Sequence, residues 1–105
     1  MSQSTNKVAV AARIPAKEGK GAELAAALQF ALDNVQSEEG TLSYILHADA
    51  SNPDSLWMYE LYASQDALNA HMGSEWFKQL GPKIGALMGG APELIFLAPI
   101  GGKGL

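Results

Sequence analysis

Four short segments of the chain carry side chains in the two-residue period of β-strands. Two other segments repeat apolar residues every three or four positions, as amphipathic helices do. The order of these segments predicts an α+β, ferredoxin-like β-α-β-β-α-β fold, in which helices cover one face of an antiparallel four-stranded sheet. We expect strands at Lys7–Ile14, Thr41–Asp49, Leu56–Ala63 and Pro92–Ala98, and helices at Gly21–Ser37 and between Ser64 and Gly73.

Turn and capping residues separate these elements. Residues 50–55, with the sequence ASNPDS, predict a loop that joins the two middle strands as a hairpin. Ser64 is expected to cap the second helix, and Gly73 to end it in a left-handed conformation. Ser74 would cap a further short helix, which Gly81-Pro82 should break. One domain then spans residues 7–100, between flexible tails at residues 1–6 and 101–105.

Three of the predicted strands are apolar on both faces. In the third strand Leu56, Met58, Glu60 and Tyr62 alternate with Trp57, Tyr59 and Leu61. The helices can cover only one face of the sheet, and a large exposed apolar face is unusual for a monomer. A second copy of the same sheet is the simplest cover for the other face. We therefore expect a symmetric homodimer that joins through the sheet.

The charge and composition narrow the range of partners. The net charge is −4 and the seven basic residues are scattered, which argues against nucleic acid as a partner. No apolar run approaches the roughly 18 residues of a membrane-spanning helix, so no membrane partner is expected. The chain has no cysteine, and its N-terminal segment lacks the apolar core of a signal peptide. We expect a cytoplasmic protein.

His71 is the first candidate for chemistry. It lies on the second predicted helix, beside the apolar stripe of Leu68 and Met72, so its imidazole should border the interior. Imidazole titrates near neutral pH and can act as a general base. The structural alternative, which is the more common role, is a histidine satisfied by a neighbouring side chain.

Glu60 is the second candidate, because a carboxylate in a central strand is costly to bury without a partner. It could orient His71, bind a substrate, or simply pair with Arg13, Lys83 or a backbone amide. Arg13 is the only arginine of the chain and lies in the first predicted strand. It is therefore a candidate partner of Glu60 and a candidate substrate contact.

Several aromatic side chains cluster around these candidates and could line a flat cavity for an aromatic ligand, although plain core packing is the alternative for each. They are Tyr44, Tyr59, Tyr62, Trp76 and Phe77. A metal site is not expected. His47 and His71 could share an ion, but they lack the carboxylate pair or thiolates that would complete the ligand set.

A set of short motifs gives the chain a resemblance to a known family. The motifs are Ile14-Pro-Ala-Lys-Glu-Gly19, Glu39-Gly40 shortly before Tyr44, Tyr59-Glu60, Asp66-Ala-Leu68 with His71, and Trp76-Phe77. Together they make the chain similar to the antibiotic biosynthesis monooxygenase domain over nearly its whole length.

The resemblance implies a dimeric α+β barrel with one pocket per subunit between sheet and helices. It implies oxidation of a small phenolic, quinol or polyketide-type aromatic by O2, without metal, flavin or haem. The substrate supplies the electrons once it has lost a proton. His71 matches the family's helix histidine and Glu60 its strand glutamate. Independently of the resemblance, we expect Trp76, Phe77, Tyr62 and Arg13 to contact the substrate.

Two other classes of function stay open. Relatives that degrade haem use an asparagine, a tryptophan and a histidine, where this chain has Ala12, His71 and Gly81, so that activity is not expected. The first alternative is a dimeric binding or stress-associated module that holds a small aromatic but does no chemistry. The second is an isomerase on the same scaffold. An oxygenase must consume O2 and an isomerase must not, while a binding module should tolerate loss of His71.

Overall fold

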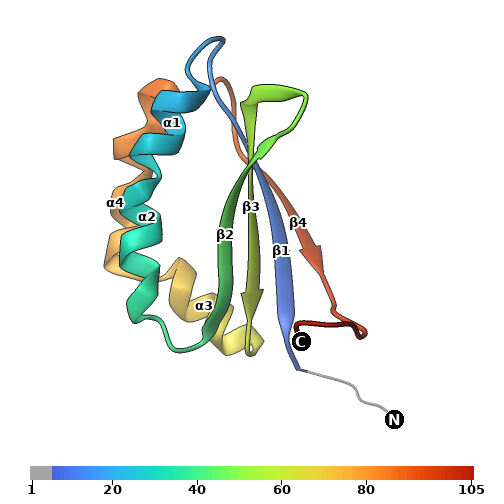
Figure 1. The fold of residues 1–105 in the computed structure, drawn as a ribbon. Coiled ribbons are helices and arrows are strands. Elements are labelled where there is room, and N and C mark those ends of the chain that lie inside the picture. The colour runs from blue at the N-terminus through green and yellow to red at the C-terminus, as the bar shows by residue number, and fades with distance from the viewer. Residues whose placement is uncertain (1–5) are drawn as a thin grey trace.

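The computed structural model describes residues 6–105 and confirms the ferredoxin-like α+β fold (Figure 1). Residues 1–5, most of the expected N-terminal tail, lie outside the described part. The strands are β1 (Val8–Pro15), β2 (Thr41–Asp49), β3 (Asn52–Tyr62) and β4 (Glu93–Leu97). The helices are α1 (Gly21–Ala27), α2 (Gln29–Asn34), α3 (Gln65–Met72) and α4 (Glu75–Ile84), with the 3₁₀ turns η1 (Val35–Ser37) and η2 (Gly85–Leu87).

The four strands form one antiparallel sheet in the order β2-β3-β1-β4, and the helices pack on one face of it (Figure 1). Paired residues on neighbouring antiparallel strands point to the same face. Tyr44 pairs with Glu60, Glu60 with Val10, and Val10 with Phe96. These four side chains therefore form a row across the helix-covered face, and the row becomes one wall of the site described below.

The core lies between this face and the helices, where apolar positions of strands and helices meet. Its fully buried members include Leu24, Leu28, Leu56, Met58 and Tyr62. Burying a side chain of this size stabilises the fold by about 1.5–3 kcal/mol. No helix within residues 6–105 is long and apolar enough to span a bilayer.

The expected helix at Gly21–Ser37 is divided into α1, α2 and η1. Leu28, between α1 and α2, has φ −70° and ψ −8°, and its carbonyl accepts the N–H of Ala31 at 2.9 Å. This tighter 3₁₀-type bond keeps the chain helical while changing its twist. The prediction was right about the helical region and wrong about its continuity.

Strand β3 begins at Asn52, so most of the expected loop belongs to the hairpin strand. The carboxylate of Asp54 accepts the backbone N–H groups of Gly19 and Gly21, both at 2.8 Å. A Cβ at Gly21 would lie 1.9 Å from the carbonyl oxygen of Pro53. The start of β3 is thus held extended by the N-terminus of α1, which the composition of residues 50–55 alone does not reveal.

The caps of α3 and α4 follow the prediction, but their ends differ from it. Ser64 Oγ accepts the N–H of Ala67 at 3.1 Å, as expected of an N-cap. Gly73 has φ −90° rather than a left-handed conformation. Helix α4 continues through Pro82, because burial of Leu80 and Ile84 one turn apart holds the segment on the core.

The face of the sheet away from the helices is apolar and largely open, as the alternation predicts. Its exposed large apolar residues include Ile45, Tyr59, Ile95 and Leu97. The polar side chains His47 and Glu93 are also exposed on this face. Residues 101–105 have no helix or strand, and they line a depression together with Tyr59 and Leu61 on this face. The flexibility of this tail and the homodimer remain predictions.

Candidate active site

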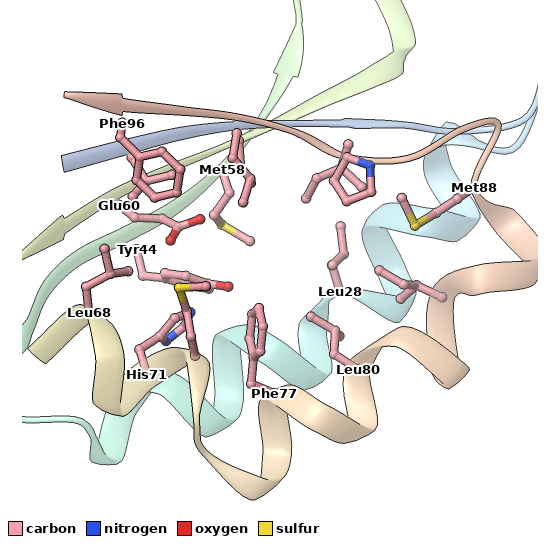
Figure 2. A pocket seen from close by; sticks show the side chains of 17 residues that line it. Leu28, Tyr44, Met58, Glu60, Leu68, His71, Phe77, Leu80, Met88 and Phe96 are labelled. Carbon is pink, nitrogen blue, oxygen red and sulfur yellow. The ribbon is translucent and has the colours of Figure 1, made fainter.

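A cavity of about 150 Å³ lies between the sheet and the helices (Figure 2). In another protein, an apolar cavity of comparable volume binds benzene. Its wall is apolar apart from Tyr44, Glu60 and His71. Met72 and Phe96 line it and are 43% and 56% exposed, so the cavity opens to solvent beside β4.

His71 reaches the cavity from α3 and is only 2% exposed. Four aromatic rings surround its imidazole, with centroids 5.0–5.3 Å away: Tyr44, Tyr62, Trp76 and Phe77. This packing leaves the ring little rotational freedom. Its Nδ1 lies 2.8 Å from Oε1 of Glu38.

Glu38 is the functional candidate that sequence reasoning missed. It lies in the loop between η1 and β2, 33 residues before His71. Its carboxylate accepts hydrogen bonds from Thr41 Oγ1 at 2.7 Å and from Trp76 Nε1 at 2.7 Å, besides its bond with His71. Burial opposes its charge, but these hydrogen bonds outweigh burial and hold the pKa of Glu38 below its usual range.

A close approach between the loop and α3 brings Glu38 to His71. A Cβ at Gly40 would lie 2.6 Å from Cβ of Ala67, so the loop requires glycine at this point. The motif Glu39-Gly40 was visible in the sequence, but the neighbouring Glu38 had no periodicity or spacing that tied it to a helix so far along the chain.

The hydrogen bond to Glu38 settles which nitrogen of His71 carries the proton. An ionised carboxylate can only accept hydrogen bonds, so Nδ1 is the donor. Nε2 of the neutral ring then carries the free lone pair. No group within residues 6–105 makes a hydrogen bond to Nε2, and His71 lines the cavity. The pair is therefore arranged as a base held in one tautomer by a carboxylate.

Glu60 faces the cavity from β3, opposite His71 (Figure 2). It is 7% exposed and accepts a hydrogen bond of 2.5 Å from the hydroxyl of Tyr62. Burial raises the pKa of Glu60 to about 7, against the opposing effect of the Tyr62 hydrogen bond. The hydrogen-bonded partner of His71 is Glu38 rather than Glu60, so the predicted orienting role belongs to a different carboxylate.

Tyr44 supplies the third polar group of the cavity, and its hydroxyl points into the space (Figure 2). Burial, together with the charges of Glu60 and Glu38, raises its pKa well above the usual value, so the phenol stays protonated. Within residues 6–105 the hydroxyl has no hydrogen-bonding partner, and it is available to a ligand.

Of the four expected substrate contacts, Phe77 lines the cavity, and Trp76, Tyr62 and Arg13 do not. Trp76 donates a hydrogen bond to Glu38, and the fully buried Tyr62 donates one to Glu60. Arg13 pairs in register with Trp57, an odd number of residues from Glu60, and therefore points to the opposite face. There it donates to Ser55 Oγ at 2.9 Å and lies 3.8 Å from Glu93, so the suggested pairing with Glu60 is wrong.

The two histidines also lie on opposite faces of the sheet. His47 pairs in register with Trp57, and its Nδ1 lies 3.0 Å from the carbonyl oxygen of Ile45. A shared metal site is therefore ruled out by position. Within the described residues, no group of three or more His, Cys, Asp or Glu side chains is arranged to hold a metal ion.

The sequence model of one protein family, antibiotic biosynthesis monooxygenase, matches residues 7–82. The chain belongs to this family. It is 30% identical to the Mycobacterium tuberculosis protein Rv0793 over 96 residues, which cover 91% of this chain and 94% of that protein. The solved structure of Rv0793 superposes with a TM-score of 0.82 at 29% identity, covering 92% of this chain and 98% of that one.

A Caulobacter crescentus protein that bears the same family name is similarly close. Its structure has a TM-score of 0.83 at 32% identity and covers 92% of each chain. A Pseudomonas aeruginosa protein, PA3566, shares the fold with a TM-score of 0.82 at 23% identity, over 95% of this chain and 100% of that one. The structural matches thus cover more than nine-tenths of the chain, and the family model includes the segment that carries Glu38, Tyr44, Glu60 and His71.

Proposed function

We propose that the protein is a cofactor-independent monooxygenase that oxidises a small phenolic, quinol or polyketide-type aromatic with O2. The observation that carries the proposal is the Glu38–His71 pair, which presents a free imidazole nitrogen to an apolar cavity. A base in an apolar cavity is the group that this chemistry needs, because the deprotonated aromatic is electron-rich enough to reduce O2 directly.

The proposed reaction balances without an added reductant. His71 Nε2 removes a proton from the substrate, and the resulting anion gives electrons to O2. For an anthrone-type substrate, one oxygen atom becomes the new carbonyl oxygen. The other leaves as water together with the two hydrogens of the oxidised methylene group. The apolar wall excludes bulk water while the anion exists.

The other cavity residues have distinct proposed roles. Phe77 offers a flat surface for an aromatic ring. Tyr44 can donate a hydrogen bond to a phenolate or carbonyl oxygen, because its own hydroxyl is protonated and unbonded. Glu60, on the wall opposite His71, can bind a second hydroxyl. The cavity volume suits one ring, and a larger polyketide would extend through the open side by Phe96.

The assembly belongs to the same proposal. The exposed apolar residues of the outer sheet face, among them Ile45 and Ile95, support a homodimer built through that face. A cytoplasmic location and the absence of any cofactor are likewise proposed.

Oxygen uptake with a panel of anthrones and hydroquinones tests the function. We expect the wild type to exceed the uncatalysed rate, and His71→Ala to lose about 10²–10⁴-fold, the usual contribution of a general base. His47→Ala is the matched control, because that histidine lies on the other face of the sheet and should retain the full rate. Equal rates in wild type and His71→Ala would remove His71 from the mechanism.

A second candidate function is isomerisation, which one observation favours. Glu60 and His71 face the same cavity from opposite walls, and a carboxyl with a pKa of about 7 can both give and take a proton near neutral pH (Figure 2). Such a pair could move a proton between two atoms of a keto or enol substrate. Product formation without O2 uptake would favour the isomerase. Tight binding that survives His71→Ala, with no product, would favour a binding module.

A further inference from the structure

We propose that Glu38 and His71 form a proton path through the wall of the cavity. On this path, a proton taken from a bound ligand reaches solvent on the Glu38 side rather than through the cavity mouth. The inference rests on the proposed function only in requiring a ligand with an acidic proton.

A second hollow lies behind His71. It is a surface depression of about 230 Å³ whose wall includes Glu38, Gly40, Thr41, Ala70, His71 and Trp76. Among residues 6–105, His71 is the one residue that lines both this depression and the apolar cavity. Its imidazole connects the two spaces through a hydrogen bond, because Nδ1 bonds to Glu38, which lines the depression, and Nε2 is left for a ligand in the cavity.

Glu38, where the proton would leave, is more exposed to solvent than His71, where the proton would be taken up. The His71 side chain is 2% exposed, whereas the Glu38 side chain is 16% exposed. The carboxylate can thus meet water from the depression, and the imidazole cannot. The other titratable groups near His71 are Tyr44, Glu60 and Tyr62, which come from β2 and β3 and face the interior.

The alternative exits are poor. The carboxyl of Glu60 is bonded to Tyr62, which is fully buried, so this acid leads away from solvent. The mouth of the cavity is lined by apolar side chains, including Met72 and Phe96, and a bound ring would fill it. Tyr44 also lines both the cavity and a separate surface hollow, but its hydroxyl points into the cavity and has no hydrogen-bonding partner within residues 6–105 (Figure 2). Once a ligand is in place, the Glu38–His71 pair is therefore the hydrogen-bonded connection between the cavity and the surface in this part of the chain.

Transfer along the path needs no group beyond those named. Nε2 takes the ligand's proton while the Nδ1 proton passes to Glu38 and then to water, so the ligand becomes an anion and Glu38 returns to a carboxylate. The ring is left with its proton on Nε2. Return of that proton to an oxygen of the product, with uptake of a proton at Nδ1 from the Glu38 side, restores the first tautomer.

The test blocks the depression without touching the cavity. Ala70 is exposed on α3 and lines the depression but not the cavity, so Ala70→Phe should fill the depression. Glu38 also lines a second hollow of about 270 Å³ beside Tyr44, which this substitution leaves open. Ala26→Phe is the matched control, an exposed alanine of α1 that lines neither space. The probe is para-nitrophenol, which absorbs strongly as the phenolate and is not oxidised by O2, so the result does not depend on oxygenase activity.

With protein in excess, a rapid pH jump is applied and the phenolate absorbance of the bound probe is followed. We expect relaxation faster than probe dissociation in the wild type and in Ala26→Phe, and at least about ten-fold slower in Ala70→Phe with unchanged affinity. Equal rates in wild type, Ala70→Phe and Glu38→Gln, or rates equal to probe dissociation, would overturn the inference. So would a probe that fails to bind or never loses its proton in the cavity.

Glu38→Gln is the second variant, because it removes the carboxylate itself, whichever hollow its proton leaves through. Gln cannot accept hydrogen bonds at both ends, so Trp76 and His71 cannot both keep an acceptor. The same slow relaxation is expected, with the neutral probe still bound. Failure of O2 uptake together with slow relaxation in Ala70→Phe would leave the proton path intact and reject only the monooxygenase.

Discussion

The hydroxyl of Tyr62 donates a hydrogen bond of 2.5 Å to Glu60, and both side chains lie on the helix-covered face of β3. The pair buries an acid whose pKa is raised to about 7, first by burial and in part by the charge of Glu38. An acid of this kind makes folding depend on pH, and it does so with a predictable sign.

Glu60 should make the protein less stable as the pH rises. Its ordinary pKa is 4.5 and its folded value is about 7, so the folded state binds the extra proton between these values. The stabilisation from this proton is complete below pH 4.5 and is lost as the pH rises through about 7. The free energy of unfolding should therefore fall by about 3 kcal/mol. Urea unfolding at a series of pH values should show this loss in the wild type, and its absence in Glu60→Gln.

The matched control for this series is Glu75→Gln, because the Glu75 side chain is 85% exposed on α4. It should keep the wild-type pH dependence. If Glu60→Gln also kept that dependence, another group would be responsible for the change and the raised pKa of Glu60 would be wrong.

Removing the Glu38 carboxylate should destabilise the protein at neutral pH. Glu38→Ala leaves His71 Nδ1, Trp76 Nε1 and Thr41 Oγ1 without their acceptor in a partly buried site. Unpaired buried donors of this kind cost about 1–3 kcal/mol. In a Trp57→Phe background Trp76 is the remaining tryptophan, and its fluorescence should shift when Glu38→Ala is added. The same fluorescence should show unfolding at a lower denaturant concentration than in the background protein.

Glu39→Ala is the control for this change, since Glu39 is the exposed neighbour in the same loop. Its unfolding free energy should stay within about 0.5 kcal/mol of the wild type. A similar loss in both variants would mean that the loop, and not the carboxylate of Glu38, carries the effect.

The fold could be predicted from the sequence because its signals are local. The strand signal of Thr41–Asp49 and the capping serine Ser64 act within a few residues, and both elements form where they were expected. Where the structure differs, a distant contact decides. Asp54 extends β3 by binding the N-terminus of α1, and the buried Leu80 and Ile84 carry α4 past Pro82.

The site was less predictable because it is assembled from distant parts of the chain. His71 could be identified by its place on an amphipathic helix, and Glu60 by its charge in a central strand. The contact between Glu38 and His71 spans 33 residues and depends on a loop conformation that no periodicity records. The predicted pairing of Arg13 with Glu60 was wrong for a related reason. Whether the two side chains share a face depends on the register between β1 and β3, which are far apart in the sequence.

The close approach at Gly40 makes a prediction about coupling between two small residues. Gly40→Ala places a methyl group 2.6 Å from Cβ of Ala67, which should cost about 1–3 kcal/mol through overpacking. Ala67→Gly alone should cost about 0.5–1 kcal/mol as a glycine in a helix. The double variant should be more stable than the sum of the two changes predicts, because the second opens room for the first. Strict additivity in a denaturation cycle would contradict the close approach.

A homodimer through the outer face predicts that charge there will separate the subunits. Ile95 is 48% exposed on that face of β4, and Leu94, also 48% exposed, is its neighbour on the opposite face. Ile95→Lys would bury a charge in the interface and should turn a wild-type dimer into a monomer, measured by light scattering. Leu94→Lys places the same charge on the same strand at an equally exposed position, but on the opposite face. This variant should remain dimeric. A wild type that is monomeric, or a dimer that both variants weaken equally, would count against pairing through the outer face and leave its apolar residues unexplained.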